Sequence, residues 1–118
     1  MRKNLTAVED MAELDRILAD SAERPLLLFK HSLTCGTSAE ALDELLSHVD
    51  AGGHDVHYAM VTVQRHRDVS QEVARRLGIR HETPQALLVR DGRVVWNASH
   101  FRLTAASVDR AIAELTGT

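Results

Sequence analysis

Several residue types are scarce in this sequence, and each scarcity excludes a class of structure or function. There is one cysteine in 118 residues, so no disulfide can form within the chain. Aromatic residues make up only 3% of the chain, too few for the stacking surfaces that bind single-stranded nucleic acid. The net charge of -3 lacks the excess of lysine and arginine that a general nucleic-acid-binding protein needs. Apolar runs such as Leu26 to Phe29 and Ala86 to Val89 are too short to span a bilayer.

The remaining composition is typical of one globular domain, with 44% hydrophobic and 26% charged residues. The first residues are polar and include Glu9 and Asp10, so they do not resemble the apolar stretch of an export signal. A lone cysteine in such a chain favours a reducing cytoplasm, where the thiol is either inert or reactive. We therefore expect a single cytoplasmic domain over residues 1–118, with neither nucleic acid nor a membrane as partner.

Four segments have the apolar spacing of helices. The first is predicted to begin at Thr6, because Thr6 and Glu9 match the capping-box pattern, and to end before Pro25. The second is predicted over residues 35–49, and the third ends at Gly78. The last follows Thr104, which has the position of a helix cap.

Four runs of apolar or β-branched residues predict strands, at residues 26–29, 56–63, 85–90 and 93–98. Asp91-Gly92 joins the last two as a hairpin turn that requires positive φ angles. A parallel β-α-β unit and an antiparallel hairpin together predict an α/β fold. It is a mixed four-stranded sheet with helices on both faces, in the order α-β-α-β-α-β-β-α.

Cys35 falls where the first predicted strand ends and the second predicted helix begins. Ligands of α/β sheets bind at this end of the strands, and the free N–H groups of a helix N-terminus favour an anion such as a thiolate. Thr34, Thr37 and Ser38 are hydroxyl neighbours that could donate hydrogen bonds to the sulfur. Lone cysteines are commonly inert core residues, but these polar neighbours favour a reactive thiol.

Cys35-Gly36-Thr37-Ser38 has the spacing of a Cys-x-x-Cys redox motif with serine in the second place. A second cysteine would resolve a mixed disulfide by intramolecular attack, and serine cannot do so. The mixed disulfide must therefore wait for an external thiol, which predicts monothiol chemistry.

Two pairs of basic residues are predicted to flank the thiol. Lys30 and His31 lie between the first strand and Cys35, and Arg80 and His81 precede Thr83-Pro84. In one cleft these residues would stabilise a thiolate and attract carboxylates, although Lys30 and Arg80 are equally explained as solvated loop charges. No metal site is expected, because His54 and His57, the closest histidine pair considered, have no clustered cysteine or carboxylate.

Three segments together resemble the YtxJ-type monothiol bacilliredoxins: Phe29 to Ser38, His81 to Gln85 and Val95 to His100. The similarity extends roughly from Leu5 to Leu115. The resemblance implies a thioredoxin-like fold in which Cys35 is the active cysteine. It also implies that Thr83–Pro84 is a cis bond beside the thiol, where a substrate chain could pair with the Thr83 backbone.

The resemblance further implies a cytosolic role in thiol homeostasis. Family members are thought to remove bacillithiol, a thiol built from cysteine, glucosamine and malate, from protein mixed disulfides. Gly36-Thr37 departs from the expected proline and aliphatic residue, and Phe101-Arg102 departs from an aromatic and acidic pair. These departures bear on substrate preference and leave the cysteine chemistry unchanged.

We therefore predict a thiol–disulfide oxidoreductase whose partners are S-thiolated client proteins. No bound cofactor is expected, and the small thiol, bacillithiol or a similar one, is the co-substrate. Two alternatives remain open. One is an Fe–S cluster carrier, since monothiol glutaredoxins also present Cys-Gly-x-Ser. The other is a redox-inactive adaptor that keeps the fold and holds peptides in the cleft.

Overall fold

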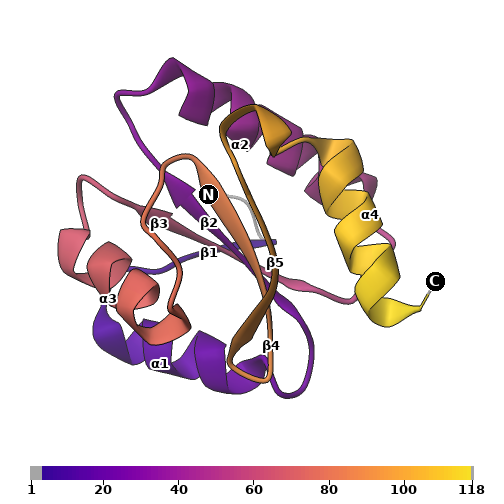
Figure 1. Cartoon of the computed structure of the whole chain (residues 1–118), viewed down its shortest axis with the longest axis horizontal. Coiled ribbons are helices and arrows are strands. Elements are labelled where there is room, and N and C mark those ends of the chain that lie inside the picture. The colour runs from indigo at the N-terminus through magenta and orange to yellow at the C-terminus, as the bar shows by residue number, and fades with distance from the viewer. Residues whose placement is uncertain (1–3, 118) are drawn as a thin grey trace.

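The computed structural model describes residues 4–117, which form one mixed sheet covered by helices on both faces (Figure 1). The sheet has five strands in the order β1-β3-β2-β4-β5. In chain order the elements are β1 (Leu5–Ala7), α1 (Met11–Asp20), β2 (Leu26–His31), α2 (Gly36–Ala51), β3 (His57–Thr62), α3 (Arg67–Leu77), β4 (Gln85–Arg90), β5 (Arg93–Ser99), the 3-10 turn η1 (His100–Arg102) and α4 (Ala105–Thr116).

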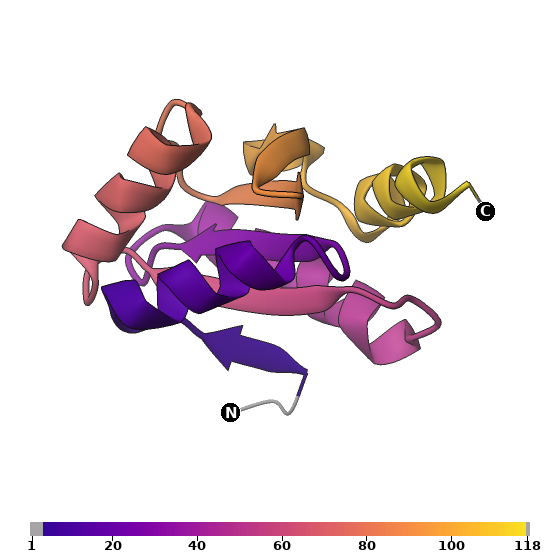
Figure 2. The same ribbon diagram turned by 90° about the horizontal axis from the view of Figure 1, so that it is seen from below.

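The pairing directions confirm the predicted mixed sheet. β3 pairs in parallel with both β1 and β2, whereas β4 pairs antiparallel with β2 and β5. Leu28 of β2 lies between Ala59 of β3 and Leu87 of β4. Figure 2 shows the outer strands, with β1 at the bottom and the β4–β5 hairpin at the top. β2 is therefore a central strand, and the loop that follows it leads to Cys35.

The prediction of a helix beginning at Thr6 is wrong. Thr6 lies in β1, opposite Ala59 of β3, and its Oγ1 is 3.0 Å from Nε2 of His57. The helix begins at Met11, where the side chain of Asp10 accepts a hydrogen bond from the backbone N–H of Glu13. Three residues are too few to show strand periodicity, so pairing with β3 decides their conformation. β1 adds the fifth strand, and the order becomes β-α-β-α-β-α-β-β-α.

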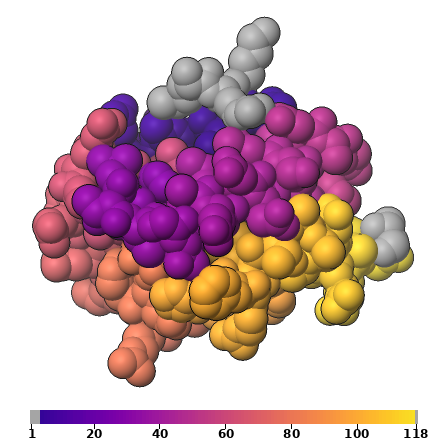
Figure 3. All heavy atoms as spheres, turned by 90° about the horizontal axis from the view of Figure 1, so that it is seen from above, coloured from indigo at the N-terminus to yellow at the C-terminus, as the bar shows by residue number. Residues whose placement is uncertain are grey.

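The core has two layers, because alternate residues of β2 point to opposite faces of the sheet. Leu27 and Phe29 pack with residues of α2 and α4, whereas Leu26 and Leu28 pack with residues of α1 and α3. All four are almost completely buried, as their continuous apolar run predicts for a strand covered on both faces. On the first of these faces α2 packs against η1 and α4, and Figure 3 shows their adjoining surfaces.

Several turns and helix ends follow their sequence signals. Asp91 and Gly92 both have positive φ angles in the hairpin turn, and Gly78 ends α3 in the left-handed conformation. Thr104 caps α4 in a capping box with Ser107. No helix within residues 4–117 is long and apolar enough to cross a membrane.

Candidate active site

Cys35 is the N-cap residue of α2, as the sequence predicts. Its backbone carbonyl accepts hydrogen bonds from the N–H groups of Ser38 and Ala39, at 3.1 and 3.2 Å. The thiol is free and partly exposed, and its side chain makes no capping hydrogen bond. The sulfur therefore lies at the positive end of the α2 dipole, where another molecule can reach it.

Ser38 is completely buried, and its hydroxyl joins the first turn of α2 to the end of β2. Its Oγ accepts a hydrogen bond of 2.9 Å from the backbone N–H of Ser32 and lies 2.8 Å from Nδ1 of His31. Burial lowers the pKa of His31, which favours its neutral imidazole. Within residues 4–117 no hydrogen bond joins the Ser38 hydroxyl to the Cys35 sulfur. The structure therefore gives Ser38 a role in holding the turn beneath the thiol.

Gln64, which the sequence interpretation missed, holds the loop before Cys35. Its amide accepts a hydrogen bond of 3.0 Å from the Leu33 N–H and donates to the hydroxyls of Ser32 and Thr34, at 2.8 and 3.3 Å. Gln64 follows β3, and β3 runs parallel to β2, so the two strand ends meet at one edge of the sheet. A polar residue just after the neighbouring parallel strand is the signal that could have identified it. The Thr34 hydroxyl therefore accepts a hydrogen bond from Gln64.

Lys30 and His31 are the last two residues of β2, so the prediction that they lie in the loop after the strand is wrong. The strand continues because Lys30 pairs with Val61 of β3 and with Gln85 of β4. Their side chains point to opposite faces of the sheet. His31 meets α2 through Ser38, whereas the Lys30 amine lies 3.0 Å from Nδ1 of His81.

Lys30 is completely buried and is not a solvated loop charge. Burial lowers the pKa of Lys30 to about 8, so its amine is still mostly protonated at neutral pH. His81 is exposed, and its pKa is lowered by partial burial and by the Lys30 charge, with Glu82 opposing the shift. Arg80 is exposed beside it, and its carbonyl accepts a hydrogen bond from the Gln85 side chain. This side therefore carries a buried amine in contact with a surface imidazole, and an exposed guanidinium beside them.

The Thr83–Pro84 peptide bond is cis, which confirms the expectation from the resemblance. Lys30 pairs with Gln85, so Pro84 occupies the next position along the strand, beside the end of β2. The Pro84 carbonyl accepts a hydrogen bond from the His100 N–H at 3.1 Å. The Thr83 backbone has no such partner among the described residues. Thr83 therefore presents an unpaired N–H and C=O just before the residue that lies beside the end of β2.

Thr37 opens onto a groove of about 360 Å³ between α2 and η1. Phe101 of η1 stands at this groove with 81% of its surface exposed. Glu40, Asp43 and Glu44 of α2 also line it, so the groove combines an exposed aromatic ring with acidic side chains. Phe101 keeps the aromatic residue of the family pattern, whereas Thr37, which departs from it, lines the same groove beside the cysteine-bearing helix.

Comparisons with known proteins agree with this geometry. The family model for the monothiol bacilliredoxin BrxC matches residues 6–108. A solved structure of a thioredoxin-fold protein proposed to be an oxidoreductase is 26% identical, with a TM-score of 0.80 and coverage of 92% of this chain and 93% of that one.

Two thioredoxins show the same fold at lower identity. Fasciola hepatica thioredoxin is 14% identical with a TM-score of 0.74, and the match covers 92% of this chain and 97% of that one. The Schistosoma mansoni thioredoxin pre-protein is 12% identical with a TM-score of 0.75, and the match covers 95% and 98%. The family match and the fold support a thiol–disulfide redox role for the thiol at the start of α2. The chain, built on a thioredoxin fold, therefore belongs to the monothiol bacilliredoxin family.

Proposed function

We propose that this protein removes a low-molecular-weight thiol, bacillithiol or a similar one, from mixed disulfides of client proteins in the cytoplasm. The observation that carries the proposal is the single free thiol at the N-cap of α2, partly exposed, with a buried serine in the place of a resolving cysteine. Membership of the monothiol bacilliredoxin family supports the same chemistry.

The reaction needs two thiol–disulfide exchanges. In the first, the Cys35 thiolate attacks the small-thiol sulfur of the mixed disulfide, so a Cys35–small-thiol disulfide forms and the client thiolate leaves. In the second, the thiolate of another small-thiol molecule attacks that disulfide, releasing the oxidised small-thiol dimer and regenerating the Cys35 thiolate. The second small thiolate donates the electron pair of the new S–S bond, so its sulfur is oxidised to the disulfide level while the client sulfur is reduced to a thiolate, which solvent protonates.

Because position 38 is a serine, the second exchange needs a thiol from another molecule. Its oxygen cannot form a disulfide, and the hydrogen bonds to Ser32 and His31 hold it in the fold. An external thiol must therefore approach the exposed side of Cys35. The protein consequently accumulates as the mixed disulfide when free small thiol is limiting, which is the state that the test below measures.

Two features suit a peptide substrate that carries an anionic thiol. The unpaired backbone groups of Thr83 offer strand-like hydrogen bonds to an extended client chain. Arg80 and His81 present positive or hydrogen-bonding groups to carboxylates, and each exposed contact contributes about 0.2–1 kcal/mol. Together they favour anionic small thiols without making any one contact decisive.

Mass spectrometry after mixing the reduced protein with a bacillithiolated client tests this function. The expected result is a single adduct of one bacillithiol on Cys35, loss of the modification from the client, and removal of the adduct by free bacillithiol. Cys35→Ser should give no adduct and leave the client modified. A glutathionylated client, run in parallel, measures the preference between the two thiols.

The same experiment can overturn the proposal. A wild-type protein that forms no adduct with either client would instead fit an adaptor that binds peptides without redox chemistry. Visible absorption of protein purified without oxygen, lost in Cys35→Ser, would instead indicate cluster binding.

A further inference from the structure

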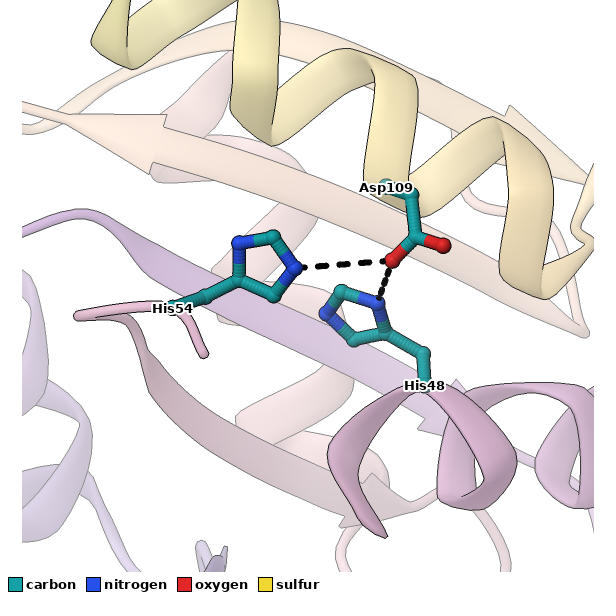
Figure 4. A group of neighbouring side chains, drawn as sticks. All are labelled: His48, His54 and Asp109. Atoms are coloured by element: carbon teal, nitrogen blue, oxygen red, sulfur yellow. Dashed lines mark hydrogen bonds and ion pairs between the residues drawn. The ribbon is translucent and has the colours of Figure 1, made fainter. Parts of the chain in front are cut away.

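A second group of chemically active side chains lies at the other end of α2. His48 in the last turn of α2, His54 in the loop before β3 and Asp109 of α4 converge on one point (Figure 4). Cys35 and His48 are separated by thirteen positions along the chain, so about 20 Å of helix divides this group from the thiol. The sequence analysis considered His54 together with His57 and expected no metal site, whereas the structure stacks His54 on His48 and hydrogen-bonds His57 to Thr6.

One oxygen of Asp109 serves both imidazoles. Oδ1 of Asp109 is hydrogen-bonded to Nδ1 of His48 and lies 3.5 Å from Nε2 of His54. The three donor atoms all lie within 4.8 Å of one another. Ligands of a tetrahedral Zn²⁺ ion, with bonds of about 2.0–2.1 Å, stand about 3.3 Å apart. The His54–Asp109 separation of 3.5 Å is close to this value, and the His48–Asp109 hydrogen bond would open to admit an ion.

The surroundings of His48 are those of a metal-binding imidazole. Its side chain is buried, and its Nε2 lies 2.6 Å from the Tyr58 hydroxyl, which orients the ring so that Nδ1 faces Asp109. Histidines that bind metals commonly use their second nitrogen for such a hydrogen bond.

The hydrogen bonds of His48 are complete without His54. Asp109 and Tyr58 already occupy both nitrogens of His48. His54 nevertheless stacks on the His48 ring, with centroids 4.9 Å apart, and points its Nε2 at the shared carboxylate oxygen. It also lines a polar hollow of about 350 Å³, together with Tyr58 and Arg24. The Asp109 side chain is 55% exposed, so an ion and water can reach the carboxylate from solvent.

We propose that His48, His54 and Asp109 form a binding site for a divalent transition-metal ion of the Zn²⁺ class, with water as the fourth ligand. Two nitrogens and one carboxylate oxygen suit such an ion better than Ca²⁺ or Mg²⁺, which prefer oxygen ligands. A bound ion would join the C-terminal end of α2 to α4 and to the loop before β3. It would therefore stabilise the fold at a distance from the thiol chemistry.

Calorimetric titration of untagged, metal-free protein with Zn²⁺ tests the site, using the Cys35→Ser variant so that the thiol cannot bind the ion. We expect one Zn²⁺ per chain with a Kd of about 1 μM or tighter. At a free Zn²⁺ concentration about 100 times the Kd, the Tm should rise by roughly 5–10 °C. No binding, or several equivalent weak sites, would overturn the proposal.

Three further substitutions in this background separate a metal site from a structural network. His54→Phe keeps a ring stacked on His48 but removes the donor nitrogen, and Asp109→Asn keeps a hydrogen-bonding partner for His48 but removes the charge. Each should weaken Zn²⁺ binding at least about 100-fold while the metal-free protein stays folded. His66→Phe, at a partly buried histidine of the α3 cap, should bind Zn²⁺ as the parent does. Unchanged binding in His54→Phe would refute the assignment.

Discussion

Two buried serines allow the contribution of the turn beneath Cys35 to be measured directly. Ser38 in α2 and Ser70 in α3 are both in the first turns of a helix, and they are 0% and 1% exposed. The Ser38 hydroxyl has two hydrogen-bonding partners, whereas the Ser70 hydroxyl has none among residues 4–117. Replacing either by alanine gives the same small gain in helix propensity, so the difference between the variants reports the hydrogen bonds.

We expect Ser38→Ala to lower the free energy of unfolding by about 1–3 kcal/mol, because the Ser32 N–H is buried and would lose its partner. Ser70→Ala should change it by less than about 0.5 kcal/mol, or raise it slightly, because the hydroxyl removed is already unpaired. In urea, with an m-value of about 2 kcal/mol/M, a loss of 2 kcal/mol moves the Ser38→Ala midpoint down by about 1 M.

Equilibrium urea unfolding followed by circular dichroism measures both values. The m-values should agree among the wild type and the two variants, so that the midpoints compare stability alone. Equal destabilisation by the two substitutions would refute the reasoning, since it would mean that loss of volume outweighs the hydrogen bonds. The alkylation rate of Cys35 adds a second readout, because only Ser38→Ala loosens the turn that carries the thiol.

Three other substitutions test the site. Ser38→Cys should form a disulfide with Cys35 and speed release of the small thiol; mass spectra that still show only the mixed disulfide would contradict the geometry at the start of α2. Burial lowers the pKa of Lys30 to about 8, so the folded protein binds fewer protons than the unfolded chain between about pH 8 and 10.4. Stability should therefore rise with pH across that window by up to about 3 kcal/mol relative to Lys30→Met, and parallel pH profiles of the two proteins would argue against a buried charged amine. Arg80→Glu should slow reaction with a bacillithiolated client several-fold at low salt but leave a neutral disulfide almost unaffected, and equal slowing of both would exclude recognition of carboxylates by Arg80.

Lys30 shows why position in the sequence did not predict which side chains surround the thiol. Lys30 and His31, five and four positions before Cys35 in the chain, suggest a pair of charges around the thiol. In the sheet they point to opposite faces, so His31 supports α2 while the Lys30 amine reaches His81, fifty-one positions away. The period of two along a strand separates side chains that are adjacent in sequence. The buried Lys30 amine therefore contacts His81, and His81 is the group exposed at the surface near Thr83.

The sequence alone determined the features that depend on a few neighbouring residues. Cys35 lies at the start of α2, Asp91-Gly92 forms the hairpin turn, Gly78 ends α3 and Thr104 caps α4. Each depends on a local backbone preference or on a hydrogen bond within one turn, so nearby residue types suffice to predict it. The apolar runs likewise predict β2 and β4 as buried strands, because burial on both faces requires a continuous apolar stretch.

The features that join distant segments follow from how the chain packs in three dimensions. Thr6 is a strand residue because β3 lies beside it, and Gln64 holds the cysteine loop because two parallel strands end at the same edge. His48 and Asp109 meet because α2 packs against α4. These contacts form because they lower the free energy of the whole packed chain. The spacing of residues along the sequence does not show which distant segments will meet.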